Sequence, residues 1–190
     1  MQATDYPTNH HTPAGNQFID RMLRAAKLEP GVYEEVEADE SSFGQAMGVV
    51  VLSSIAAGIG TFTTGGFGGL LLGTIAALLG WYVWAFITFF VGTKFLPEAQ
   101  TSADQGQMLR TIGFSSSPGL LRIFGIIPVV GLIIQLAASI WMLVAMVIAV
   151  RQALDYTSTG RAIGVCLIGW LIQFVVIAIL FALVGIVPGT

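Results

Sequence analysis

The sequence predicts an all-α protein, a polytopic transmembrane helix bundle of five spans with a short N-terminal amphipathic helix. Of the 190 residues, 55% are hydrophobic and only 10% are charged, whereas soluble domains carry about 25% charged residues. Hydrophobic runs long enough to cross a bilayer follow one another from Phe43 onward. The basic residues fall in or beside the connections on one side of such a bundle. These three observations together define the fold class.

The N-terminal segment divides into two parts. Residues 1–16 are rich in Thr, Asn, Pro and His and predict a disordered tail. Residues 17–42 predict a cytosolic amphipathic helix followed by an acidic linker, with Arg21, Arg24 and Lys27 spaced three apart on one helix face. This helix either lies on the membrane with its basic residues toward anionic lipid head groups, or packs on the cytosolic end of the bundle. Both alternatives fit the pattern.

Residues 43–187 predict the membrane domain, and residues 188–190 an outer tail. A hydrocarbon core of about 30 Å requires roughly 20 helical residues. The apolar stretch from Pro118 to Val150 is too long for one span, and Pro128 interrupts it. A short third span therefore precedes a full fourth. The predicted spans are Phe43–Phe62, Gly66–Phe95, Ser117–Val129, Gly131–Arg151 and Ala162–Val187.

The basic residues predict the topology. With the N-terminus in the cytosol, five crossings place all eight Lys and Arg residues on the cytosolic side and none in the outer segments. Arg110 then lies in the loop before the third span. Arg122 is expected near the cytosolic end of that span, close enough to snorkel to the interface. The C-terminus is predicted to lie outside.

Small residues recur at every fourth position in the first two spans. The positions include Gly44 and Gly48 in the first span and Gly65, Gly69 and Gly73 in the second. Such ridges allow helix backbones to approach closely, which is a main source of helix association in lipid. They predict helix packing either inside the bundle or against a partner subunit.

Tryptophans lie well inside the spans rather than at their ends. Trp81 and Trp84 belong to the second span, and Trp141 and Trp170 to the fourth and fifth. Interfacial positions are the usual ones for tryptophan in membrane proteins. The central positions indicate core packing, or a groove for a pigment, quinone or lipid.

The sequence predicts no enzyme and no cofactor or metal. No Asp, Glu, His or Lys lies in the central part of any span, and Arg122 is expected to reach the interface. Because proton relays and ion-coupled transport depend on intramembrane ionisable groups, their absence argues against a transporter. No motif for a catalytic nucleophile or a zinc site occurs. Membrane lipids and membrane proteins are the expected partners, and no nucleic acid is.

The segment Ile112–Leu121, IGFSSSPGLL, resembles the Yip family of five-span membrane proteins that interact with Rab-type GTPases. Gly113, Phe114 and Pro118 match the glycine-aromatic pair and proline found in the family before the third span. The stretch Ile140–Val165 is similar to the prokaryotic branch of the family. Ser41–Gln45, SSFGQ, keeps only an aromatic-glycine pair of the eukaryotic motif, which argues against GTPase binding.

The resemblance implies a non-enzymatic scaffold or adaptor in a prokaryotic cell membrane, acting through its cytosolic face. The residues expected to form that face are Arg21, Arg24, Lys27, Arg110 and Arg122. A second hypothesis is an accessory subunit of a larger membrane complex, such as an energy-transducing one. A third is a transporter or channel for a small solute.

Overall fold

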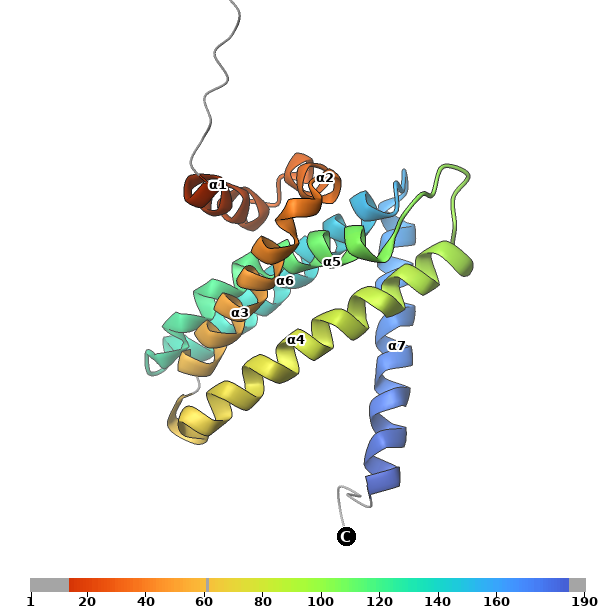
Figure 1. The fold of residues 1–190 in the computed structure, drawn as a ribbon. Coiled ribbons are helices and arrows are strands. Elements are labelled where there is room, and N and C mark those ends of the chain that lie inside the picture. Colours follow the sequence, from red (N-terminus) through yellow and green to blue (C-terminus); the bar gives the residue numbers. More distant parts are fainter. Residues whose placement is uncertain (1–13, 61, 185–190) are drawn as a thin grey trace, which may run out of the picture.

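The structure is a computed structural model and describes residues 14–60 and 62–184. These residues form seven α-helices and two 3₁₀ helices, η1 and η2, and no strand among them (Figure 1). In chain order the elements are α1 (Ala14–Ala26), α2 (Pro30–Ala38), η1 (Glu40–Ser42), α3 (Phe43–Gly60), α4 (Phe62–Lys94), α5 (Gln105–Phe114), η2 (Ser117–Ile126), α6 (Val130–Ala153) and α7 (Thr159–Val184).

Four of the helices are long and apolar enough to cross a membrane. They provide the candidate spans Glu40–Gly60, Gly66–Lys94, Val130–Ala153 and Thr159–Val176. Large apolar side chains project outward from them, including Leu72, Leu132 and Phe174, each more than 70% exposed. Exposure of this kind suits lipid as the surrounding solvent. The predicted all-helical, multi-pass membrane architecture is therefore confirmed.

The predicted third span is the part that differs. Its residues form η2, a ten-residue 3₁₀ helix that packs between α3 and α6. Ten residues of 3₁₀ helix rise about 20 Å, which is less than the roughly 30 Å of a hydrocarbon core. Pro118 lies in its first turn, and Val129, with a left-handed φ of 69°, reverses the chain into α6. Five spans were predicted, the third of them short, and the described residues contain four helices long enough to cross a membrane.

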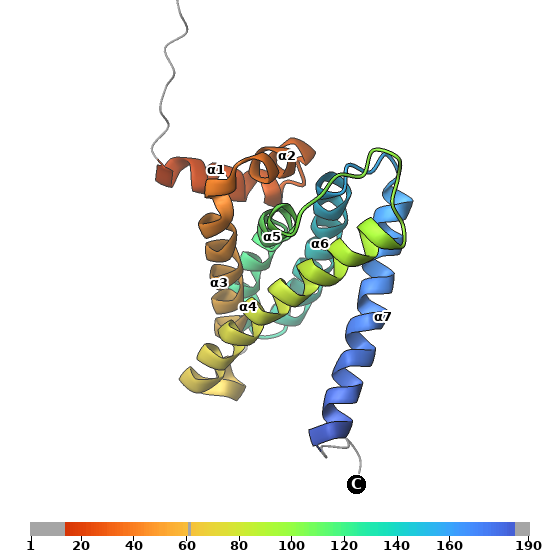
Figure 2. The ribbon, with the colours of Figure 1, turned by 45° about the vertical axis from the view of Figure 1, so that its right-hand side comes forward.

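Helices α1, α2 and α5 lie across one end of the bundle, and we call them the polar layer (Figures 1 and 2). Two buried apolar clusters support this end. One joins α1 and α2 to α3, α5 and α6 and includes Tyr33, Val36 and Phe114. The other joins α4, α5, α6 and α7 and includes Trp84 and Leu154. The bundle is thus packed most densely beneath the polar layer.

Helix α1 begins at Ala14, a little before the predicted start at residue 17. It packs against α2, α5 and η2. Of the two arrangements that the sequence left open, the structure has the one in which the helix packs on the end of the bundle. The predicted tail at residues 1–16 lies outside the described residues up to residue 13, as does the tail at 188–190.

Candidate functional site

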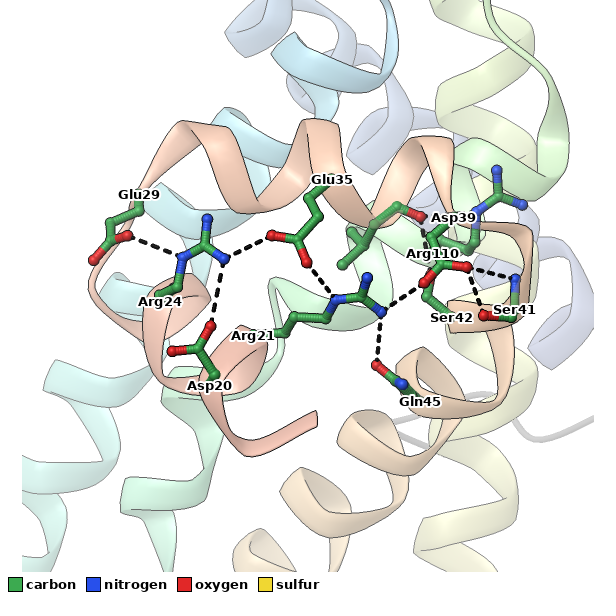
Figure 3. Close-up of polar contacts among 11 residues, drawn as sticks. Asp20, Arg21, Arg24, Glu29, Glu35, Asp39, Ser41, Ser42, Gln45 and Arg110 are labelled. Atoms are coloured by element: carbon green, nitrogen blue, oxygen red, sulfur yellow. Dashed lines mark hydrogen bonds and ion pairs between the residues drawn. The ribbon is translucent and has the colours of Figure 1, made fainter. Parts of the chain in front are cut away.

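Ion pairs fasten α1 to α2 within the polar layer (Figure 3). Arg21 is only 2% exposed. Its guanidinium lies 2.8 Å from Glu35 Oε1 and 2.8 Å from Asp39 Oδ2, and it donates to Gln45 Oε1 at 3.1 Å. Arg24 lies 2.6 Å from the other oxygen of Glu35. Buried charges of this kind are tolerated only when they are paired and hydrogen-bonded, and here they join three helices.

The pKa values of the acidic side chains reflect these partners. Burial alone would raise the pKa of Glu35, but the guanidinium groups of Arg21 and Arg24 bring it below its usual value. Hydrogen bonds from Ser41, together with Arg21, lower the pKa of Asp39. Glu37 behaves oppositely, because burial, reinforced by Asp155, raises its pKa to about 7. The polar layer therefore contains carboxyl groups whose pKa values are shifted in opposite directions.

Arg110 connects α5 to the C-terminal end of α2. The side chain is 7% exposed, and its Nε donates to the carbonyl oxygen of Val36 at 3.0 Å. Its Nη2 donates to the carbonyl oxygen of Glu37. These carbonyls belong to the last turn of α2, where they have no partner within the helix. A cation in this position also interacts favourably with the helix dipole.

Gly113, Phe114 and Pro118 form the joint between α5 and η2. A Cβ on Gly113 would lie 2.7 Å from the Cβ of Ala46, so glycine allows α3 and α5 to touch. Phe114 ends α5 and is fully buried, while Pro118 is buried in the first turn of η2. Ser117 Oγ donates to the carbonyl oxygen of Phe114 across the joint. These residues are packing residues that redirect the chain into the bundle.

Arg122 lies far from the other basic side chains. Its Nη2 donates to Ser139 Oγ at 3.1 Å, and Ser139 is the tenth of the 24 residues of α6. At 1.5 Å per residue, about 14 Å of helix precedes Ser139 and about 21 Å separates it from the end near Arg151. The expectation that Arg122 reaches the cytosolic interface is therefore wrong. The predicted absence of charge at mid-bilayer depth stays a prediction.

The 3₁₀ geometry of η2 explains where Arg122 points. With three residues per turn, Gly119, Arg122 and Gly125 lie above one another on one face. A Cβ on Gly119 would collide with Ser53 of α3 and Met142 of α6, and one on Gly125 with Gln135 of α6. The two glycines thus let the neighbouring helices close on η2, and Arg122 is the long side chain of that face.

A cavity of about 300 Å³ lies beside Arg122 between the helices of the bundle and is partly open to the outside. We call it the Arg122 cavity. Its walls come from α3, α4, α6 and α7 and from the joint between α5 and η2. Its lining is partly aromatic and partly polar, including Trp81, Trp84, Trp170, Ser53, Gln173 and Arg122. It is the candidate binding site of the molecule.

The Arg122 cavity contains hydrogen-bond donors without acceptors. Trp84 is 6% exposed, and its Nε1 is buried without a partner among the described residues. Arg122 Nε is likewise buried and unpaired. Trp81, by contrast, donates from its Nε1 to the carbonyl oxygen of Leu109 at 3.0 Å. Nearly all buried polar groups in proteins are paired, and here two unpaired donors belong to residues that line one cavity.

The family of the chain follows from a comparison with family models. The model of the Yip1 domain matches residues 31–181. The chain belongs to the Yip family. Comparisons with curated proteins and with solved structures give no match. The match spans α2 to most of α7, so it includes the joint at Gly113, Phe114 and Pro118 and all four candidate spans.

The fold brings some of the predicted site residues together and separates others. Arg21, Arg24 and Arg110 meet around α2, while Lys27 is exposed at the end of α1 and Arg122 is elsewhere. The three arginines have partners inside the chain, and their role toward an external partner remains a prediction. Nothing in the sequence pointed to Ser139. The central positions of Trp81, Trp84 and Trp170 had left open a groove for a pigment, quinone or lipid, and the spacing of Gly119, Arg122 and Gly125 was a second signal.

The glycines predicted to pack helices have mixed surroundings. A Cβ on Gly48 would meet Phe18 of α1 at an ordinary distance of 3.7 Å. A Cβ on Gly44, Gly69 or Gly73 would meet nothing within 4 Å. The surroundings of Gly65 lie outside what the structure describes. Within the Yip1 domain, close helix contacts instead involve glycines such as Gly92 and Gly113.

Proposed function

We propose that this Yip family member is a non-enzymatic membrane scaffold or adaptor that presents its polar layer to partners at one membrane surface. The observation that carries the proposal is the locking of α1, α2 and α5 by the buried Arg21 and Arg110. A layer held this way offers a fixed surface, and preorganised surfaces lose less entropy on binding. The Yip family generally consists of non-enzymatic membrane proteins.

The exposed side of α1 suits contact with lipid. Ile19 and Leu23 lie four residues apart on the helix and are 51% and 53% exposed. Residues at this spacing share one helix face. Our proposal is that this apolar face rests in the membrane interface, while Arg21 and Arg24 hold the opposite side to α2. In this proposal the apolar face of α1 contacts the lipid, in place of the arginines that the sequence pattern had assigned to it.

Our proposed topology retains five crossings, with η2 as the short one. In support, η2 connects α5 in the polar layer to the start of α6 at the other end of the bundle (Figure 1). The polar layer, the end of α6 and the start of α7 carry all basic residues except Arg122 and Lys94, which ends α4 nearby. By the positive-inside rule this surface is cytosolic. We place the protein in a prokaryotic cell membrane.

Photo-crosslinking in the native membrane tests the adaptor proposal. A benzophenone amino acid would replace Lys27 or Glu34, both exposed in the polar layer, and, as controls, Leu72 or Leu132 on the lipid-exposed helices. The adaptor proposal expects discrete protein adducts from the polar-layer positions and lipid adducts from the controls. Absence of any protein adduct at Lys27 and Glu34 would contradict it.

An accessory subunit of a larger membrane complex is the second candidate. The open surroundings of Gly69 and Gly73 favour it, because a Cβ at either position would meet nothing within 4 Å among the described residues, whereas Leu70 and Thr74 on another face of α4 contact α3. Leu72 and Leu79 beside them are 71% and 64% exposed. Protein adducts from Leu72 alone would select this candidate over the adaptor. The substitutions Gly69→Leu and Gly73→Leu should then reduce the native size of the complex.

A further inference from the structure

We infer that the Arg122 cavity is a binding site for one single-chain amphiphile with an anionic head, of the fatty-acid class. In this site the carboxylate pairs with Arg122 and the hydrocarbon chain lies against the tryptophans. The inference concerns the space between the helices of the bundle and does not depend on the proposed adaptor role of the polar layer.

The charge of Arg122 points to an anion. All eleven acidic residues lie outside the segments 43–97 and 105–154, so no carboxylate comes from the helices that surround Arg122. Its hydrogen bond to Ser139 has a neutral acceptor. An uncompensated charge inside a membrane is costly, and such residues are usually paired or functional. A bound anion would provide the missing counter-charge.

The unpaired donors give the anion its position. Arg122 Nε and Trp84 Nε1 are both buried without an acceptor, and both residues line the cavity. An ionised carboxylate offers two oxygens that accept hydrogen bonds and suits the planar guanidinium. Hydrogen bonds to such a charged group are about twice as strong as neutral ones. One acidic head group can thus satisfy donors that the chain leaves without partners.

The remaining lining suits a hydrocarbon chain. Trp81, Trp84 and Trp170 contribute aromatic surface, and Met142 and Met146 contribute flexible thioether side chains. Methionine adapts readily to apolar ligands of irregular shape. A volume of about 300 Å³ lies at the lower limit of ligand pockets. This size favours one chain over a two-chain phospholipid.

Tryptophan quenching by a brominated fatty acid tests the inference. The full-length protein would be placed in neutral phosphatidylcholine nanodiscs and titrated with dibromostearate at a pH that keeps the acid ionised. We expect saturable quenching that unbrominated stearate reverses. The substitution Arg122→Gln should weaken binding at least about tenfold, as expected for the loss of a buried charge-assisted contact. Lys94→Gln removes an exposed charge at the end of α4 and should leave binding unchanged.

A second variant can still test the inference if Arg122→Gln misfolds. Trp84→Phe keeps an aromatic ring, removes the Nε1 donor, and should weaken binding several-fold. Equal affinity of dibromostearate for wild type and for both cavity variants would overturn the inference. Dibromo-octadecanol that binds as tightly as the acid would overturn the role of the charge. A brominated two-chain phosphatidic acid that binds more tightly than the acid would overturn the single-chain assignment.

Discussion

Arg21 has the most constrained surroundings of the basic residues in the polar layer. It is 2% exposed, while its acidic partners Glu35 and Asp39 have side chains 37% and 29% exposed. The buried guanidinium therefore meets carboxylates that keep part of their hydration. Such a pair connects α1 to the end of α2 with a defined geometry, because Arg21 also reaches Gln45 of α3.

Replacing Arg21 by methionine should release α1 from α2. Removing one partner of a buried ion pair costs about 3–5 kcal/mol, and we expect about 3 kcal/mol because the acids remain partly hydrated. Amide hydrogen exchange of α1 and α2 in nanodiscs would measure the loss of protection. The matched control is Lys27→Met on the exposed end of α1, with an expected change within about 0.5 kcal/mol. Equal protection in both variants would contradict the structural role of Arg21.

Glu37 should make the polar layer more stable in weak acid. Its pKa is raised from 4.5 to about 7 by burial, so the folded protein binds this proton more tightly than the unfolded chain does. The contribution is present below pH 4.5 and is lost as the pH rises to about 7. Hydrogen exchange of α2, measured across this range, should show increasing local opening. Glu37→Gln should flatten that dependence, whereas Glu40→Gln, which is exposed, should not.

At the scale of single residues, the sequence indicated which side chains are charged but not which side chains they pair with. Arg21, Arg24 and Lys27 look equivalent by spacing, yet only Lys27 is exposed. The difference arises because α2 folds back over α1 and brings Glu35 between Arg21 and Arg24. That arrangement depends on tertiary packing of Tyr33 and Val36, which local periodicity does not contain.

Among the elements, the contact of α3 with α5 depends on Gly113. A methyl group there would press on Ala46, a residue that is fully buried. We expect Gly113→Ala to destabilise the protein by about 1–3 kcal/mol, the usual cost of overpacking. Gly44→Ala in α3 provides the control, since its new methyl group would meet nothing within 4 Å, and it should be neutral or slightly stabilising. Unfolding of the reconstituted protein in a denaturing detergent, followed by circular dichroism, would compare them.

The elements themselves were largely predictable from hydropathy. The spans predicted at Phe43–Phe62 and Gly131–Arg151 agree with α3 and α6 to within two residues at each end. The predicted third span has the 3₁₀ form because Pro118, Gly119 and Gly125 reduce α-helical preference, and because it packs between α3 and α6. Composition alone does not distinguish the two kinds of helix.

For the whole molecule, the proposed five crossings predict that the two termini lie on opposite sides. In a Cys166→Ala background, cysteines at Lys27 and at Thr190 would be treated with an impermeant maleimide in intact cells. We expect the cysteine at Thr190 to react and the one at Lys27 to react only after permeabilisation. Reaction of both from the same side would exclude five crossings and support an even number.

The asymmetry of the molecule was visible in the sequence, but of the candidate site only the central tryptophans were. Ten acidic residues of the described part and the seven basic residues outside η2 mark one polar end. The Arg122 cavity arises where α4 and α7 meet residues from four other segments. Such a juxtaposition combines positions as distant as Ser53 and Gln173, and a single sequence carries no information about which distant positions meet.

The three-residue repeat of η2 fixes the length of this segment. Adding or removing one residue between Pro118 and Arg122 would turn the guanidinium by about 120° around the helix axis. Gly119 and Gly125 would then no longer bracket Arg122 against α3 and α6. Connecting segments ordinarily tolerate insertions and deletions. In η2, however, we expect a change of one residue in length to disrupt the packing of the helix and to turn the Arg122 side chain away from its present position.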